Sequence, residues 1–318
     1  MPFCRLFESN DLLPAAWQEE FGDGPVRVFN PGLLRADKGW IFAFRAVGPD
    51  LVRRIGICRL GPELQPIAGS SLPWSDQIRF PPGTGYPEQA LGWFADPRLY
   101  RLNGRLFVYW NSGWHEPQNF QFLQEIDPLD FRPLGPPREL RLRGPRRPLE
   151  KNWTLFGADP IRVLYSLRPQ RVLTLSLAGE GPIECVGTGP WEAAPSGGGV
   201  GELRGGAPPQ LVGDHYFAIG HVIEVGPGGY RYAAAVHRFG RQSPFVPSAP
   251  ARAFLPLPNP RAGRRLYERL NPAVSEAIYP CGADYLDGEW TLSYGLNDEC
   301  CAVAVLPHAE LLATLPPD

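Results

Sequence analysis

One pattern of apolar and polar positions recurs along the chain: an apolar strand, a tight polar turn, an aromatic-rich strand and a third strand. Alternating apolar and polar residues are typical of half-buried β-strands. In the clearest copy, residues 97–111, Asn103-Gly104 separates two apolar stretches and predicts a two-residue hairpin turn. The copies are centred near residues 40, 104, 162, 214 and 288.

A single copy of this pattern is too small to bury both faces of its sheet. Five small sheets around a common axis would cover one another, which is the arrangement of a β-propeller. The sequence therefore predicts an all-β fold, a single five-bladed β-propeller domain over residues 1–318. A two-sheet sandwich is the alternative, but it does not account for the long repeat. Short helices are expected only near the termini, within 12–21 and 308–315.

Composition agrees with a large folded domain. The chain has 318 residues, of which 43% are hydrophobic, and this is enough to form a large core. The 36 glycines and 38 prolines stand between the apolar stretches, as turn residues do in all-β proteins. Basic (31) and acidic (33) residues nearly balance, so no overall field favours nucleic acid or an anionic membrane as a partner.

The cysteine pattern and the N-terminal stretch bear on the compartment. The first residues lack the basic and then apolar pattern of a signal peptide, and no run approaches the roughly 18 apolar residues of a membrane span. The six cysteines are scattered without a C-x-x-C pair, so no zinc motif is present. We expect a cytoplasmic protein with free thiols and no bound metal. The oligomeric state stays open.

Unexpected polar residues stand at equivalent places in the predicted blades. The innermost strands of a propeller converge on its axis, so these side chains would meet there. Each alone could be a buried structural group, but charge from five blades aimed at one axis is costly unless a polar ligand binds. The residues are Asn30 and Arg45; Asp96 and Arg98; Glu150, Lys151 and Asn152; Arg204 and His221; and Asn297 and Asp298.

The predicted axial set is rich in cations and poor in carboxylates. Glycoside hydrolysis uses two carboxylates. One carboxylate beside Arg, Lys and His suits phosphorolysis, because the cations hold an anionic nucleophile that needs no general base. The set therefore favours phosphate or sugar-phosphate chemistry. A β-mannoside hydrolase and a non-catalytic glycan-binding propeller are the alternatives.

Five segments in this order resemble glycoside hydrolase family 130, whose members are five-bladed β-mannoside phosphorylases and mannosidases. Glycosyltransferase family 108 is similar to that family. The resemblance spans roughly residues 28–307. It is carried by the segments FNPGLLR, FAFRAVG, ADPRLY, GGAPPQLVGDHYFAIGH and YGLND.

The resemblance implies a role for each matching residue. Asp96 of the D-P-R motif would be the catalytic acid. Arg45 and Asp298 would lie by the sugar, and we expect Asn30, Arg98 and Asn152 of the axial set to bind it with them. Phosphate binding would fall to Lys151, Arg168 and His221. The implied enzyme is an inverting phosphorylase or glycosyltransferase of β-mannosides, with mannose 1-phosphate or another activated mannose as donor and no cofactor besides phosphate or sugar phosphate as substrate.

Two departures from the family pattern leave the substrate and the donor open. Ala95 stands where the family usually has an acidic residue before D-P-R. The segment EKNW, which contains Lys151, differs from the best-known phosphorylases and is closer to the transferase-like branches. Neither departure removes Asp96.

Overall fold

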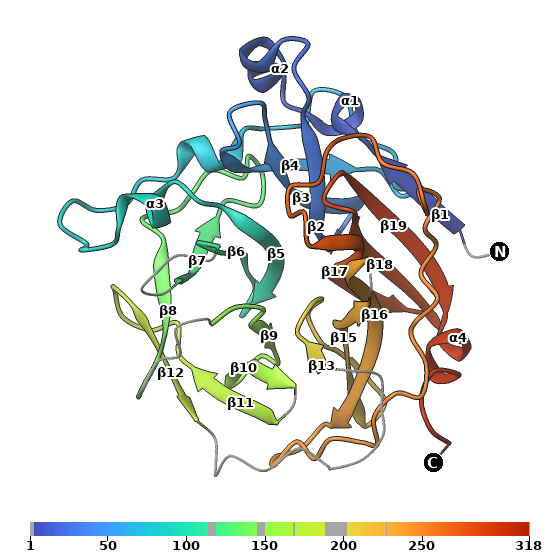
Figure 1. Ribbon diagram of the computed structural model, residues 1–318. Coiled ribbons are helices and arrows are strands. Elements are labelled where there is room, and N and C mark those ends of the chain that lie inside the picture. The colour runs from blue at the N-terminus through green and yellow to red at the C-terminus, as the bar shows by residue number, and fades with distance from the viewer. Residues whose placement is uncertain are drawn as a thin grey trace.

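The protein is mostly β, as the sequence predicts. The computed structural model describes residues 3–113, 119–144, 150–167, 169–187, 202–226 and 228–317. Within these residues the strands form consecutive, largely antiparallel groups, and Figure 1 shows the groups arranged around a common centre. None of the helices in the described part is long and apolar enough to cross a membrane.

Five such groups follow one another in the described residues. The first is β2 (Arg27–Ala36), β3 (Gly39–Val47) and β4 (Arg53–Leu60). The second is β5 (Ala95–Leu102), β6 (Arg105–Asn111), β7 (Gln121–Ile126) and β8 (Arg138–Leu142). The third is β9 (Thr154–Phe156), β10 (Ile161–Leu167), β11 (Gln170–Leu175) and β12 (Ile183–Gly187). The fourth is β13 (Glu202–Arg204), β14 (Gln210–Val212), β15 (His215–Gly226) and β16 (Gly229–Gly240).

The fifth group is built from both ends of the chain. It contains β17 (Val274–Leu286), β18 (Glu289–Leu296) and β19 (Cys300–Pro307), and β19 pairs with the N-terminal strand β1 (Phe3–Phe7). Parallel contacts join β8 to β12 and β16 to β17, so neighbouring groups are also linked along their strands.

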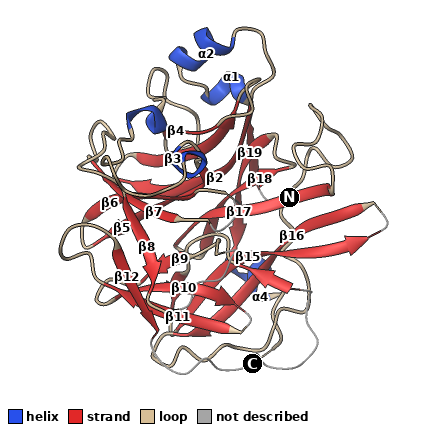
Figure 2. Cartoon of the chain, turned by 60° about the vertical axis from the view of Figure 1, so that its left-hand side comes forward, coloured by secondary structure: helices blue, strands red, loops and turns tan. Residues whose placement is uncertain are grey.

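The helices are short. Figure 2 shows α1 (Ser9–Leu12) and α2 (Ala15–Phe21) together at one end of the molecule. A 3₁₀ turn, η1, spans Trp74–Gln77, α3 spans Glu88–Leu91, and α4 (His308–Leu312) follows β19 directly. Trp17 of α2 is fully buried and donates its indole N–H to Asp76 at 2.8 Å, which fixes α2 against η1.

The predicted Asn103-Gly104 hairpin is confirmed. Leu102 of β5 pairs with Arg105 of β6 across the turn. Both turn residues have positive φ, +49° and +76°, as a type I′ turn requires. The all-β pattern and its clearest turn were therefore predictable from local sequence.

Three strands near the centre are interrupted at a proline or directly after one. The register shifts between Phe29 and Gly32 in β2, between Ala95 and Arg98 in β5, and between Pro280 and Gly282 in β17. Proline has no N–H for the ladder, so it is tolerated where pairing breaks. The preceding residues in β2 and β5, Asn30 and Asp96, have φ of +50° and +53°. A bulge re-aims side chains, and here it turns both of them toward the centre.

Glycines let the backbones of neighbouring groups touch. A Cβ on Gly32 of β2 would lie 2.8 Å from the carbonyl oxygen of Pro97 in β5. A Cβ on Gly206 would lie 2.9 Å from the carbonyl oxygen of Pro280 in β17. Side chains on the interrupted strands are therefore held by direct contact between backbones.

We expect Gly32→Ala to destabilise the protein by about 1–3 kcal/mol, because the added methyl group overpacks a contact between backbones. Gly187→Ala, at the exposed end of β12 where a Cβ meets nothing within 4 Å, is the control and should change stability by less than about 0.5 kcal/mol. Urea denaturation measures both. Equal stability of the two variants would contradict the close contact.

Candidate active site

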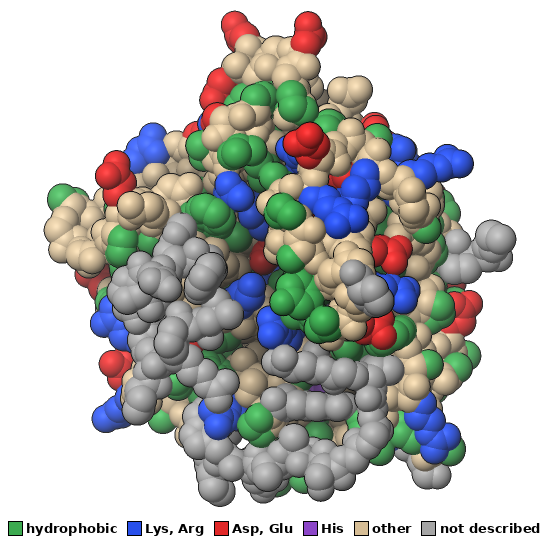
Figure 3. All heavy atoms as spheres, viewed as in Figure 1, with side chains coloured by type: hydrophobic (Ala, Val, Ile, Leu, Met, Phe, Trp, Pro, Cys, Tyr) green, Lys and Arg blue, Asp and Glu red, His purple; other side chains and the backbone are tan. Residues whose placement is uncertain are grey.

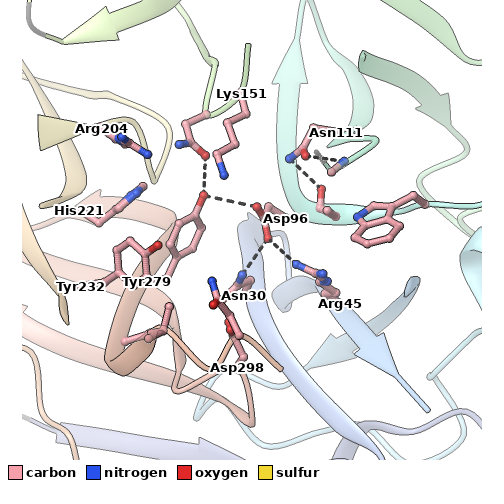
Figure 4. Close-up of a pocket in the computed structure, with 17 residues that line it drawn as sticks. Asn30, Arg45, Asp96, Asn111, Lys151, Arg204, His221, Tyr232, Tyr279 and Asp298 are labelled. Carbon is pink, nitrogen blue, oxygen red and sulfur yellow. Dashed lines mark hydrogen bonds and ion pairs between the residues drawn. The ribbon is translucent and has the colours of Figure 1, made fainter. Parts of the chain in front are cut away.

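A pocket at the centre of the molecule takes residues from all five groups of strands. Its volume is about 260 Å³, close to the lower limit for small-molecule sites. Figure 4 shows its side chains pointing toward one another, and Figure 3 shows Lys and Arg side chains beside the hollow on this face. The residues predicted at the axis that line this pocket are Asn30, Arg45, Asp96, Lys151, Asn152, Arg204, His221 and Asp298.

Asp96 is the most connected side chain in the pocket. Its Oδ1 accepts a hydrogen bond from Asn30 Nδ2 at 2.7 Å and lies 3.3 Å from Arg45 Nη1. Burial alone would raise the pKa of Asp96. The charge of Arg45 and the hydrogen bond from Asn30, helped by Arg98 and Lys151, outweigh burial and hold the pKa below its usual range. Asp96 is therefore ionised in the free protein at neutral pH.

Arg98 is not among the residues that line the pocket. Its side chain is fully buried, its Nε donates to the carbonyl oxygen of Gly206 at 2.5 Å, and its guanidinium lies over the ring of Tyr109. Nη1 and Nη2 have no hydrogen-bond partner among the described residues. This position does not agree with the prediction that Arg98 binds the sugar. It is a buried positive charge that stabilises ionised Asp96 and ties the second group to the fourth.

Lys151 and Arg204 form the cationic side of the pocket, and His221 lies beside them (Figure 4). Burial lowers the pKa of Lys151, and Arg204 and Arg45 add to this effect while Asp96 opposes it. Burial, with Lys151 and Arg204, lowers the pKa of His221 to about 3, so this imidazole is neutral. An anion bound here would relieve the repulsion between Lys151 and Arg204.

The turn that carries Lys151 and Asn152 is fixed from behind by Glu150. The Asn119 side-chain amide both accepts from the Glu150 N–H, at 2.8 Å, and donates to the Glu150 carbonyl. The Tyr165 hydroxyl donates to Glu150 Oε1 at 3.0 Å. Glu150, which the sequence placed with the axial residues, is buried and acts as this anchor.

Asp298 lines the pocket and lies beside Asn30 in Figure 4. Asn297 and Asp298 follow β18 with φ of +57° and +58°. Asn297 is structural, because its Oδ1 accepts from the backbone N–H of Ala277 at 3.0 Å. Burial raises the pKa of Asp298, and Asp96 adds to this effect while Arg45 opposes it. Arg168, predicted to bind phosphate, lies outside the described residues.

Three aromatic residues of the pocket were missed by sequence reasoning: Trp93, Tyr232 and Tyr279. Arg53 lies 4.0 Å from the ring centre of Trp93, so one face of the indole is covered. The Tyr279 hydroxyl lies 2.6 Å from Asn152 Oδ1 and 3.4 Å from Asp96 Oδ2. A signal for it existed, since Tyr279 precedes Pro280 as Asn30 precedes Pro31 and Asp96 precedes Pro97.

In the part of the chain that the structure describes, no group of three or more His, Cys, Asp or Glu could hold a metal ion. The six cysteines are free thiols, and five of them are buried.

No protein-family model and no curated protein sequence matches the chain. Solved structures do. A β-1,2-mannobiose phosphorylase from Listeria innocua, in complex with β-1,2-mannobiose, is 13% identical with a TM-score of 0.62 over 98% of this chain and 99% of that one. A mannose phosphorylase from Leishmania mexicana, in complex with phosphate ion, is 11% identical with a TM-score of 0.52 over 92% and 86%.

A third structure comes from work on the family 130 mannoside phosphorylases, described as containing glycoside hydrolases that target β-1,2 mannosidic linkages in Candida mannan. It is 14% identical with a TM-score of 0.62 over 92% of this chain and 87% of that one. At these identities the comparison shows a shared fold. It confirms the resemblance to glycoside hydrolase family 130.

The low pKa of His221, about 3, makes stability depend on pH. An ordinary histidine has a pKa of about 6.5, so between these values the unfolded chain binds more protons than the folded chain. Stability therefore falls as the pH drops from about 7 to 4. In His221→Gln this fall, measured by urea denaturation across the range, should be smaller. An unchanged slope in His221→Gln would contradict the buried neutral imidazole.

Proposed function

We propose that this protein is an inverting β-mannoside phosphorylase, which cleaves a β-mannoside with phosphate or runs the same reaction toward synthesis. One observation carries the proposal: the hydrogen-bonded carboxylate of Asp96 shares one pocket with the cations Lys151 and Arg204 and with the neutral imidazole of His221. The fold shared with mannoside phosphorylases supports it.

The proposal includes the architecture. We interpret the five groups of strands as the blades of a single propeller, closed by β1 on β19. The pocket would then lie at one end of its axis, where residues from all blades meet. The proposed compartment is the cytoplasm, which the free cysteines support.

In phosphorolysis, Asp96 in its acid form donates its proton to the leaving oxygen while phosphate attacks C1 from the opposite face. The C1–oxygen bond to the leaving sugar breaks, a C1–phosphate oxygen bond forms with inversion, and the leaving sugar departs as an alcohol. Phosphate held by Lys151 and Arg204 partly neutralises the cations that keep Asp96 ionised, and so raises the pKa of this acid when the substrate is present.

In the synthetic direction the roles reverse. Ionised Asp96 takes the proton of the acceptor hydroxyl as that oxygen attacks C1 of mannose 1-phosphate, and phosphate leaves into the basic side chains. Asn30, Arg45, Asn152 and Asp298 would orient the mannose. Transfer from another activated mannose would use the same groups. Neither direction requires a cofactor.

Inverting hydrolysis is the second candidate, and Asp298 is the observation that favours it. A second carboxylate in the pocket could activate water, and burial moves the pKa of Asp298 toward the working range of a general base. Phosphate dependence of the reaction separates the two candidates.

The decisive assay mixes the protein with mannose 1-phosphate and a panel of acceptor sugars and measures released phosphate. Phosphate release supports the proposal. Cleavage of β-1,2-mannobiose in phosphate-free buffer would establish the hydrolase, and sugar binding without turnover would establish a glycan-binding module.

Asp96→Asn should lower kcat by roughly 10²–10⁴-fold and keep sugar binding, as measured by calorimetry. Full activity of Asp96→Asn would eliminate Asp96 as the acid.

The chain contains two lysines, Lys38 and Lys151, which gives a matched test of the phosphate site. Lys151→Met should raise the KM for phosphate at least tenfold, because a charge-assisted contact contributes about 1.5–3 kcal/mol. Lys38→Met, at an exposed position, should leave this KM unchanged. If both variants bind phosphate like the parent, Lys151 is not a phosphate ligand.

A further inference from the structure

The Tyr279 hydroxyl lies between the proposed acid and Asn152. It is 2.6 Å from Asn152 Oδ1 and 3.4 Å from Asp96 Oδ2. Tyr279 stands directly before Pro280, the last paired residue ahead of the interruption of β17, and its ring lies 4.5 Å from the imidazole of His221, centre to centre. Figure 4 shows the phenol oxygen pointing to both partners. The hydroxyl thus has two polar neighbours, and its ring packs against His221.

The contact between the Tyr279 hydroxyl and Asp96 favours the protonated form of this carboxyl group. A phenol has one proton to donate. The bond to Asn152 Oδ1 is much the shorter, so the proton is donated there. The phenol oxygen then presents a lone pair to Asp96 Oδ2, and this contact is favourable only when Oδ2 carries a proton. Burial raises the pKa of Tyr279 well above its ordinary value, so the phenol itself stays protonated.

The other oxygen of Asp96 has the opposite surroundings. Oδ1 accepts from Asn30 Nδ2 and lies beside Arg45 Nη1, and both contacts favour the charged form. The two oxygens of one carboxyl group are therefore differentiated. Charge is stabilised at Oδ1, and a proton is stabilised at Oδ2.

We propose that Tyr279, oriented by Asn152, is a positioning residue that holds the transferable proton of Asp96 on Oδ2. The inference rests on the proposed function, in which Asp96 is the acid. At 3.4 Å the acceptor is weak, so a leaving oxygen at normal hydrogen-bond distance takes the proton. That proton passes from Oδ2 to the leaving oxygen as the C1–oxygen bond breaks, and Tyr279 neither gains nor loses a proton.

Other groups also act on Asp96, and the test variants leave them in place. The charged or titratable ones are Arg45, Arg98, Lys151, Asp298 and His221. Neutral phenols and a thiol, Tyr109, Tyr232 and Cys281, are also close enough to interact with it. A change seen on removing the Tyr279 hydroxyl alone is therefore not due to the loss of a charge.

The test is Tyr279→Phe, read by carbon-13 NMR titration of the Asp96 carboxyl, with that signal assigned by its absence in Asp96→Asn. Loss of the acceptor should lower the pKa of Asp96 by about 0.5–1 unit, the equivalent of one hydrogen bond. The high-pH limb of phosphorolysis should move down by the same amount. Tyr232→Phe removes a hydroxyl from the other tyrosine packed on His221, and it should keep the parent's pH profile whatever its effect on KM.

A raised pKa of Asp96 in Tyr279→Phe would overturn the inference, because the phenol would then be a donor to the carboxylate. An unchanged pKa would overturn it by reducing Tyr279 to a packing role. Asn152→Gly is a second variant, and glycine accepts the φ of +64° at this position. It frees the phenol proton to bond to Asp96 and should also lower the pKa, and no change there would count against the inference. A wild type inactive with every acceptor would refute the proposed function, while the NMR titration still decides the role of Tyr279.

Discussion

The site depends on the interruption of hydrogen-bonded pairing at Pro31 and Pro97 and directly after Pro280. A regular strand would direct alternate side chains into the packed layers on either side. The missing N–H and the positive φ of the preceding Asn30 and Asp96 break that alternation where neighbouring groups meet. Close contacts at glycines then hold the broken segments in place. The strain of these backbones lies where the chemistry is proposed, as is common at functional sites.

Charge is distributed around one carboxylate. Arg45 forms an ion pair with Asp96, and the charges of Arg98 and Lys151 also lower the pKa of Asp96. A buried arginine without hydrogen bonds to both terminal nitrogens is expensive. Neither terminal nitrogen of Arg98 has a hydrogen-bond partner among the described residues. The charge of Arg98 lowers the pKa of Asp96. The arrangement makes the protonation state of Asp96 depend on whether an anion is present.

Much of the fold was accessible from sequence, and so was most of the site. Local periodicity predicts the strand pattern and the Asn103-Gly104 turn. The convergence of distant polar residues follows from the propeller arrangement that the repeated pattern implies. Arg98 was misplaced for a specific reason: it is two residues from Asp96, so a regular strand would put both on one face, and the bulge at Pro97 removes that parity. Tyr279 was missed because a tyrosine in an apolar strand is usually a core residue. Its hydroxyl partners come from two other groups, and no local pattern reveals them.

The pairing of β1 with β19 has a consequence for biosynthesis. Phe3 lies opposite Val305, so this pairing closes a loop of nearly the whole chain and carries the entropy cost of such a closure. Until Cys300–Pro307 has left the ribosome, β1 is an unpaired strand whose free edge can recruit other chains. Any folding intermediate that lacks β19 therefore exposes the edge of β1 to pairing with other chains.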